Sequence, residues 1–262
     1  MNQFYVTLPS DSSMSIYPKN TVAKFTTKLP DRIVLDGEYE VALTEILYPA
    51  SYKNFISNGM VIVFKPKDDE LNSVTYSIPS GYYSDEDSFC TNLSKGMNYA
   101  IQTKYGDTAD RITWRFDKHS RKLSFKVSVS AAAIIMNAAA ADRLGFNTYV
   151  DVGHSIRERV EKTASKYFDL IAGTRLIYLY SDIASYNYVG DMKTPLLRVF
   201  NMEGQRGSMV AKTFLQAQYL PVSRREFETI DIQINNEIGI PMLFMIGKVV
   251  VTLHFRRVNK YL

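Results

Sequence analysis

Cysteine is nearly absent from this sequence, since Cys90 is the single cysteine in 262 residues. One cysteine cannot form an intrachain disulfide or build a thiolate metal cluster. The lack of a disulfide framework favours a reducing intracellular compartment. Histidine is almost as scarce, with three residues in all, and none of their spacings matches a metal-ligand motif. The sequence therefore predicts no metal site and no bound cofactor.

The chain also lacks a long hydrophobic run and a large excess of one charge. Its most apolar segment, 238–255, is interrupted by Pro241, two glycines and Lys248, so we expect no membrane span. The first residues have neither the basic region nor the apolar core of a signal peptide. Lys and Arg total 31 against 27 Asp and Glu, a net charge of +4. This balance is too even to indicate a nucleic-acid-binding domain by itself.

Aromatic residues, by contrast, are abundant, with 18 tyrosines and 14 phenylalanines. Many lie in short segments that alternate apolar and polar residues, the pattern of half-buried strands. In the last such segment, valine, leucine and phenylalanine occupy one face and His254 the other. We expect His254 to be a polar residue on the solvent face. The expected strands are 3–8, 21–29, 38–49, 60–65, 73–78, 174–182, 195–200, 212–222, 229–235 and 248–257.

The middle of the chain has a different pattern. Phe89, Leu93, Met97 and Ile101 recur every four residues, which predicts one apolar helix face. Acidic and hydroxyl residues before this stretch, and Gly106 after it, are typical of helix ends.

A polar turn then joins two alternating segments, which predicts a hairpin over 111–129. Alanine predominates in 131–146, so we expect a second helix there, ended by Gly145. Residues 147–169 are polar and predict an irregular connector. The expected organisation is a β-sandwich formed by 1–79 and 166–262, interrupted by an α+β subdomain at 80–165 (helix, hairpin, helix, connector).

No set of residues predicts catalysis. His119, His154 and His254 fall in a turn, a connector and a strand, without the paired spacing of a zinc enzyme or a cupin. Cys90 has no histidine near it in sequence to lower its pKa. The sequence contains no nucleophile elbow, P-loop or dinucleotide fingerprint. We therefore expect a protein that is not an enzyme.

Basic residues gather near the end of the chain, at Arg256, Arg257 and Lys260. Such a cluster is ordinarily a solvated strand end. The alternative is contact with phosphates or with an inner capsid surface, because binding to a nucleic-acid backbone needs only clustered cations.

Two tyrosine-rich loops are the candidates for contact with an external ligand. One carries Tyr82 and Tyr83, and the other Tyr186 and Tyr188. Tyrosine is enriched at interfaces because its ring is apolar and its hydroxyl polar.

The strand segments themselves resemble a known family. "FYVTLPSDSSMSIYPKNTVAKFTTKLPDRIVLDGEYEVALTEILYP", "LIYLYSDI", "VGDMKTPLLRVF", "YLPVSRREFETIDIQI" and "GKVVVTLHFRR" are similar to segments of the penton (minor capsid) proteins of Polinton/Maverick elements, virophages and adintovirus-like viruses. They occur in the same order and cover both ends of the chain. The middle matches only in style.

The resemblance implies a mainly β fold, a single jelly-roll sandwich with an inserted subdomain. It implies a homopentamer at the fivefold vertices of an icosahedral virion, beside a major capsid protein with a double jelly-roll. It also implies assembly inside the host cell, a possible host receptor for the insert, and possible contact with packaged DNA. No Arg-Gly-Asp triplet is present, so integrin binding is not implied. The alternative is a ligand- or receptor-binding jelly-roll module that is not a vertex pentamer.

Overall fold

The computed structural model describes residues 2–57, 59–66, 73–106, 112–127, 131–152 and 159–258. The chain divides into two compact units. We call residues 1–53 with 173–262 the discontinuous unit, and residues 54–172 the inserted unit. Each has a hydrophobic core of its own, and each is described by itself.

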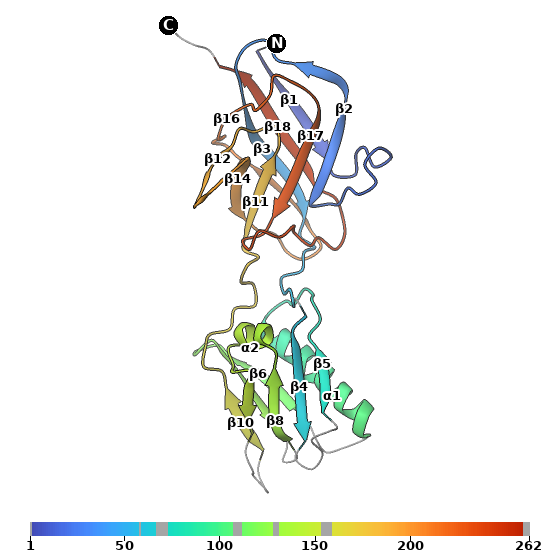
Figure 1. The fold of residues 1–262 in the computed structure, drawn as a ribbon, viewed down its shortest axis with the longest axis vertical. Helices are drawn as coiled ribbons and strands as arrows, with labels where there is room; N and C mark the ends of the chain where they lie inside the picture. Colours follow the sequence, from blue (N-terminus) through green and yellow to red (C-terminus); the bar gives the residue numbers. More distant parts are fainter. Residues whose placement is uncertain are drawn as a thin grey trace. The chain divides into compact units, whose positions relative to one another are not determined.

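The discontinuous unit contains two antiparallel sheets (Figure 1). The first has the order β1-β18-β3-β15, with the short strand β16 also paired to β3. Its strands are Gln3–Pro9 (β1), Val250–Arg257 (β18), Tyr39–Pro49 (β3), Met209–Thr213 (β15) and Leu220–Pro221 (β16). The second has the order β14-β11-β17-β2. Its strands are Leu196–Asn201 (β14), Leu176–Ser181 (β11), Glu226–Asn235 (β17) and Lys24–Val34 (β2).

The strand order defines the fold of this unit. Numbered from one to eight along the chain, with the short strands left out, the first sheet runs one, eight, three, six. The second runs five, four, seven, two. Two four-stranded sheets connected in this way form a jelly roll. The predicted fold class is confirmed, and the inserted unit lies between the third strand (β3) and the fourth (β11).

Alternating side chains of both sheets form the core of the jelly roll. On β18, Val251, Leu253 and Phe255 are buried, as the period of two requires. The ring of Phe255 stacks on Phe4 of β1 at 4.8 Å and on Phe227 of β17 at 5.8 Å between centroids. Because β1 and β17 belong to different sheets, this stack links the two layers.

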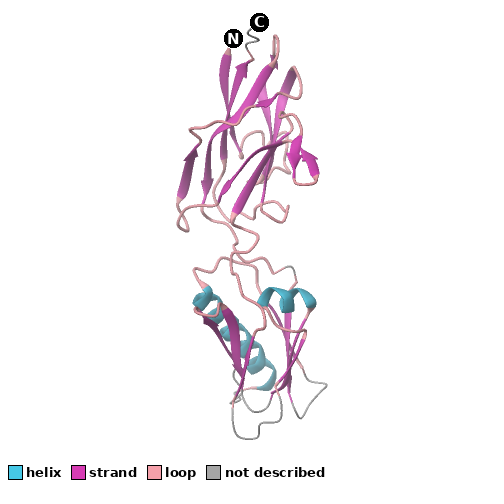
Figure 2. Cartoon of the chain, turned by 90° about the vertical axis from the view of Figure 1, so that its left-hand side faces the viewer, coloured by secondary structure: helices cyan, strands magenta, loops and turns pink. Residues whose placement is uncertain are grey.

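The inserted unit combines two small sheets with two helices (Figure 2). One sheet has the order β5-β4-β8-β9 and the other the order β10-β7-β6. The first is built from Val74–Ser77 (β5), Val61–Pro66 (β4), Ala131–Met136 (β8) and Tyr149–Asp151 (β9). The second is built from Val160–Thr163 (β10), Lys122–Val127 (β7) and Ile112–Asp117 (β6), and the helices are Glu86–Tyr105 (α1) and Ala138–Leu144 (α2). No helix of the described residues is long and apolar enough to cross a membrane.

Helix α1 follows its sequence pattern closely. The Asp85 side chain caps the N-terminus by accepting a hydrogen bond from the Ser88 amide, and Gly106 follows the last turn. The four predicted apolar residues are all buried. On the flank beside β6, the Asn98 side chain pairs with both backbone groups of Ile112, at 2.8 and 2.9 Å. The predicted helix and the hairpin after it, β6 with β7, are both present.

The helix expected at 131–146 is half wrong. Residues 131–136 form strand β8, and the helix α2 begins only at Ala138, capped by Asn137. Alanine favours helices, but β8 pairs with β4 on one side and β9 on the other, and this pairing overrides local propensity. Gly145 ends α2 in the left-handed conformation, as predicted.

The boundaries of the inserted unit also need correction, from 80–165 to 54–172. Strands β4 and β5 look like sandwich strands in the sequence, but β4 pairs with β8 and their side chains join the core of the inserted unit. The expected connector contains the strands β9 and β10. Its residues 153–158, with His154, lie outside the described residues.

Candidate functional site

The basic residues at the end of β18 are paired with acidic side chains. Both Nε and Nη2 of Arg256 donate to Oε2 of Glu40 on β3, at 3.1 and 3.0 Å. Arg257 forms an ion pair with Asp36 at 3.8 Å. Lys260, the third predicted contact residue, lies outside the described residues. The two arginines are therefore partly neutralised within their own sheet.

Aromatic side chains surround Arg256 and His254 on the outer face of the first sheet. The Arg256 guanidinium lies 3.5 Å from the centroid of the Tyr219 ring, a cation–π contact. The Tyr219 hydroxyl and Nδ1 of His254 are 2.7 Å apart, and Tyr5 stacks on the imidazole at 4.4 Å between centroids. We call Tyr5, Glu40, Tyr219, His254 and Arg256 the β18 cluster.

His254 differs from its predicted state as a polar surface residue. It is on the outer face of β18, but it is only 6% exposed because Tyr5 and Tyr219 cover it. Burial lowers its pKa, and the nearby charge of Arg256 lowers that pKa further. Its Nε2 has no hydrogen-bond partner among the described residues. A neutral imidazole that accepts from the Tyr219 hydroxyl at Nδ1 fits all of these observations.

The four tyrosines predicted for ligand contact do not form one site. Tyr82 and Tyr83 belong to the inserted unit, whereas Tyr186 and Tyr188 belong to the discontinuous unit. Tyr83 is a core residue, with its hydroxyl donating to the Pro79 carbonyl at 3.1 Å. The burial of its ring against Phe55 and Phe89 removes it from solvent. Tyr82 is half-buried.

Tyr186 and Tyr188 are exposed, at 62% and 83%. They lie on and beside a hairpin of two short strands, Asn187–Val189 (β12) and Met192–Thr194 (β13), in the connection between β11 and β14. Met192 on the second strand is also 66% exposed. This hairpin presents apolar side chains to solvent, which is typical of a contact surface.

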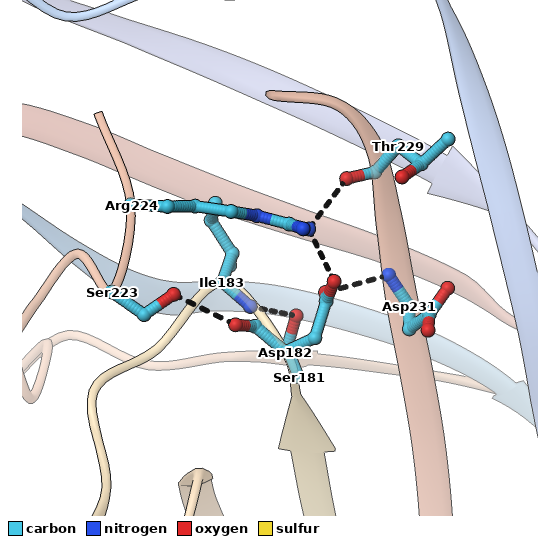
Figure 3. Close-up of polar contacts among 7 residues, drawn as sticks. All are labelled: Ser181, Asp182, Ile183, Ser223, Arg224, Thr229 and Asp231. Atoms are coloured by element: carbon cyan, nitrogen blue, oxygen red, sulfur yellow. Dashed lines mark hydrogen bonds and ion pairs between the residues drawn. The ribbon is translucent and has the colours of Figure 1, made fainter. Parts of the chain in front are cut away.

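A polar cluster that sequence reasoning missed joins β11, β17 and the loop before β17 (Figure 3). The Asp182 carboxylate accepts from the Arg224 guanidinium and from the Asp231 amide, the latter at 2.8 Å. Arg224 also donates to the Thr229 carbonyl at 3.0 Å. Burial raises the pKa of Asp182, while the Asp231 amide and Arg224 lower it. The partners are too far apart in sequence for a local motif to reveal this cluster, and its geometry is that of a structural clasp.

The structure does not assemble the groups needed for nucleophilic catalysis around Cys90. The thiol is buried in α1, and burial raises its pKa to about 12, so it is protonated at neutral pH. His119 lies in the turn of the β6–β7 hairpin. Among the described residues, no group of three or more His, Cys, Asp and Glu side chains is arranged to hold a metal ion.

Fold and surface together define a class: a single jelly roll with an α+β insert and exposed contact surfaces. Among solved structures, the crystal structure of mavirus penton protein has a TM-score of 0.52 and 12% identity, covering 98% of this chain and 100% of that one. The cryo-electron microscopy structure of the Sputnik virophage matches with a TM-score of 0.46 and 12% identity, over 98% of each chain. The chain matches no protein-family model and no curated protein. At this identity the likeness to mavirus penton protein is one of fold.

Proposed function

We propose that this chain is a structural virion protein, a penton (minor capsid) subunit that forms homopentamers at the fivefold vertices of an icosahedral capsid. The observation that carries the proposal is the likeness to mavirus penton protein over the full length of both chains. Jelly rolls also occur in lectins and cupins, so the sandwich alone does not specify a function. The likeness extends through the insert, which makes a penton the better interpretation.

The proposed surroundings follow from this role. The partner is a major capsid protein with a double jelly-roll fold, and the location is the virion, assembled inside the host cell. A host receptor would bind the inserted unit. The protein would work by contact and not by catalysis, in keeping with the buried, protonated thiol of Cys90.

The first test is the mass of the purified protein in solution, measured by light scattering and followed by negative-stain imaging. One chain is 29.9 kDa, so five would give 5 × 29.9, about 150 kDa, in a five-membered ring. A monomer or trimer that stays so when the major capsid protein is added would contradict the proposal.

A second candidate is a ligand- or receptor-binding module that does not form a vertex. The exposed side chains of Tyr186 and Tyr188 favour it, because such tyrosines could serve a bound ligand as well as a neighbouring subunit. A stable monomer that loses a ligand when both tyrosines are replaced by serine would support this function over the penton.

Contact of Arg256, Arg257 and Lys260 with packaged DNA or the inner capsid surface remains a prediction. The ion pairs with Glu40 and Asp36 reduce the charge that the arginines offer to phosphates. Replacing all three with alanine is expected to lower DNA retention in assembled particles, and unchanged assembly and packaging would contradict the prediction.

A further inference from the structure

Two unused surface features lie at opposite edges of the second sheet of the jelly roll. The first is the hairpin, residues 186–193, beside the edge strand β14, and the second is a groove beside the other edge strand, β2 (Figure 1). The groove has a volume of about 660 Å³, and its walls include Ile16, Tyr17 and Pro18. One feature projects and the other is recessed.

The hairpin is held in a defined position. Its strands pair over three residues each, with a tight turn at Gly190, where φ is +60°. The Asn187 side chain donates to the Leu196 carbonyl of β14 at 3.0 Å, which fastens the hairpin to the sheet edge. Tyr188 and Met192 nevertheless remain mostly exposed. Because the exposed apolar side chains are already ordered, docking them costs little conformational entropy.

The groove is equally well ordered. Asn20 uses its side chain like a neighbouring strand, accepting from the Thr26 amide at 3.0 Å and donating to the Thr26 carbonyl at 2.9 Å. The Ser13 hydroxyl accepts from the Lys28 amide in the same way, at 3.0 Å. The loop before β2 therefore occupies this part of the strand edge, so a partner must bind through side chains and not by adding a strand.

We propose that the hairpin of one copy docks in the groove of a neighbouring copy of the same chain, and this inference rests on the proposed pentameric function. A closed ring needs two different complementary patches on each subunit, and opposite edges of one sheet supply them. Tyr188 and Met192 match the apolar wall formed by Ile16 and Pro18.

The charges match as well. Asp191, at the tip of the hairpin, would face Lys19 and Lys24 of the groove, while Lys193 would face Asp231. A hairpin-to-hairpin contact related by a twofold axis would bring the two Asp191 residues together, and their repulsion disfavours it. The occupant of the groove is thus a second copy in a head-to-tail arrangement.

Cross-linking tests the contact directly. The variant Tyr188→Cys with Ile16→Cys, treated with a short bismaleimide, is expected to yield a covalent ladder that ends at five chains. Wild type is the control because its one thiol, Cys90, is buried. Each single variant, and Tyr188→Cys paired with Tyr99→Cys in the inserted unit, should yield no ladder. A five-chain particle in which the Tyr188–Ile16 pair does not cross-link would overturn the inference and leave the proposed function intact; a monomer of wild type would contradict both.

A charge exchange provides a second test that tolerates failure of the cysteine variant. Asp191→Lys is expected to weaken association by about tenfold, and adding Lys19→Asp with Lys24→Asp should restore it. Asp142→Lys in the inserted unit makes the same charge change on an exposed residue and should have no effect. Equal effects of Asp191→Lys and Asp142→Lys, or no restoration by the triple variant, would overturn the inference.

Discussion

At the scale of single residues, the β18 cluster shows that position on a strand does not determine exposure. His254 alternates with core residues and projects from the outer face, yet Tyr5 and Tyr219 bury it. Because Arg256 lies next to it, a proton on the imidazole is unfavourable in the folded protein.

Acidification is therefore expected to destabilise the discontinuous unit. Burial and Arg256 lower the pKa of His254 in the folded state, whereas an unfolded histidine titrates near pH 6.5, about its ordinary value. As the pH falls, the unfolded chain binds the proton first, so the contribution present above about pH 6.5 is lost as the pH falls toward the folded-state pKa. Urea unfolding at pH 7.5 and 5.5 measures the loss.

His254→Gln is expected to remove the histidine-dependent part of this loss. His119→Gln, in an exposed turn of the inserted unit, should retain it. The same pH dependence in wild type and His254→Gln would show that His254 is not the responsible group.

The Asp182–Arg224 clasp leads to a second prediction at this scale. Arg224→Met would leave a half-buried carboxylate without its cation, so the free energy of unfolding should fall by about 1–3 kcal/mol. Arg32→Met breaks an exposed ion pair with Glu226 in the same unit and should cost under about 1 kcal/mol. Chemical denaturation of both variants decides the point, and equal losses would contradict a structural role for the clasp.

At the scale of elements, α2 depends on how closely the chain passes its C-terminal end. Gly145 has φ +80°, and a Cβ there would lie 2.6 Å from the Lys166 carbonyl oxygen, which is fixed backbone. The Gly145 carbonyl accepts hydrogen bonds from the amides of Ser165 and Lys166, so the two segments cannot separate freely.

Gly145→Ala is accordingly expected to destabilise the inserted unit by about 2–4 kcal/mol, combining left-handed backbone strain with a steric clash. Gly59→Ala is the matched control, because Gly59 has φ +73° in the same unit but no atom within 4 Å of the added methyl. It should cost about 1 kcal/mol, the strain alone. Thermal unfolding followed by circular dichroism compares the two, and equal shifts in Tm would refute the close-approach argument.

At the scale of the whole molecule, the important fact is that each unit has its own core. The jelly roll includes strands from both ends of the chain, while the inserted unit is one continuous segment. Such an arrangement predicts that the insert can be removed without loss of the sandwich.

Replacing residues 54–172 with a short glycine-serine linker is expected to leave a soluble β-protein that unfolds cooperatively. The narrower deletion of 86–160, suggested by the sequence pattern, should fail because it leaves β4 and β5 without α1 and β8. Ile62 and Phe64, now buried, would then be exposed. Circular dichroism and solubility test both chains, and a soluble, folded 86–160 deletion beside an aggregated 54–172 deletion would contradict the observed boundary.

The sequence by itself determined the elements whose patterns are local. The helix with Phe89, Leu93, Met97 and Ile101 on one face, the hairpin after it and the alternating strand that ends at Arg257 all agree with the structure. Their patterns are legible because the period of side chains on a helix or strand is set by backbone geometry within the element. The jelly-roll class was also predicted, from the order of segments that resemble penton proteins.

Only the tertiary structure decided which residues become neighbours across long stretches of chain. Strand β8 replaces a helix because β4 and β9 pair with it, and the insert begins at residue 54 because β4 pairs there and not in the sandwich. His254 is buried by Tyr5, and the clasp joins Asp182 to Arg224. Each outcome depends on a partner outside the reach of a local pattern, because burial and pairing are properties of residues that meet only after the chain has folded.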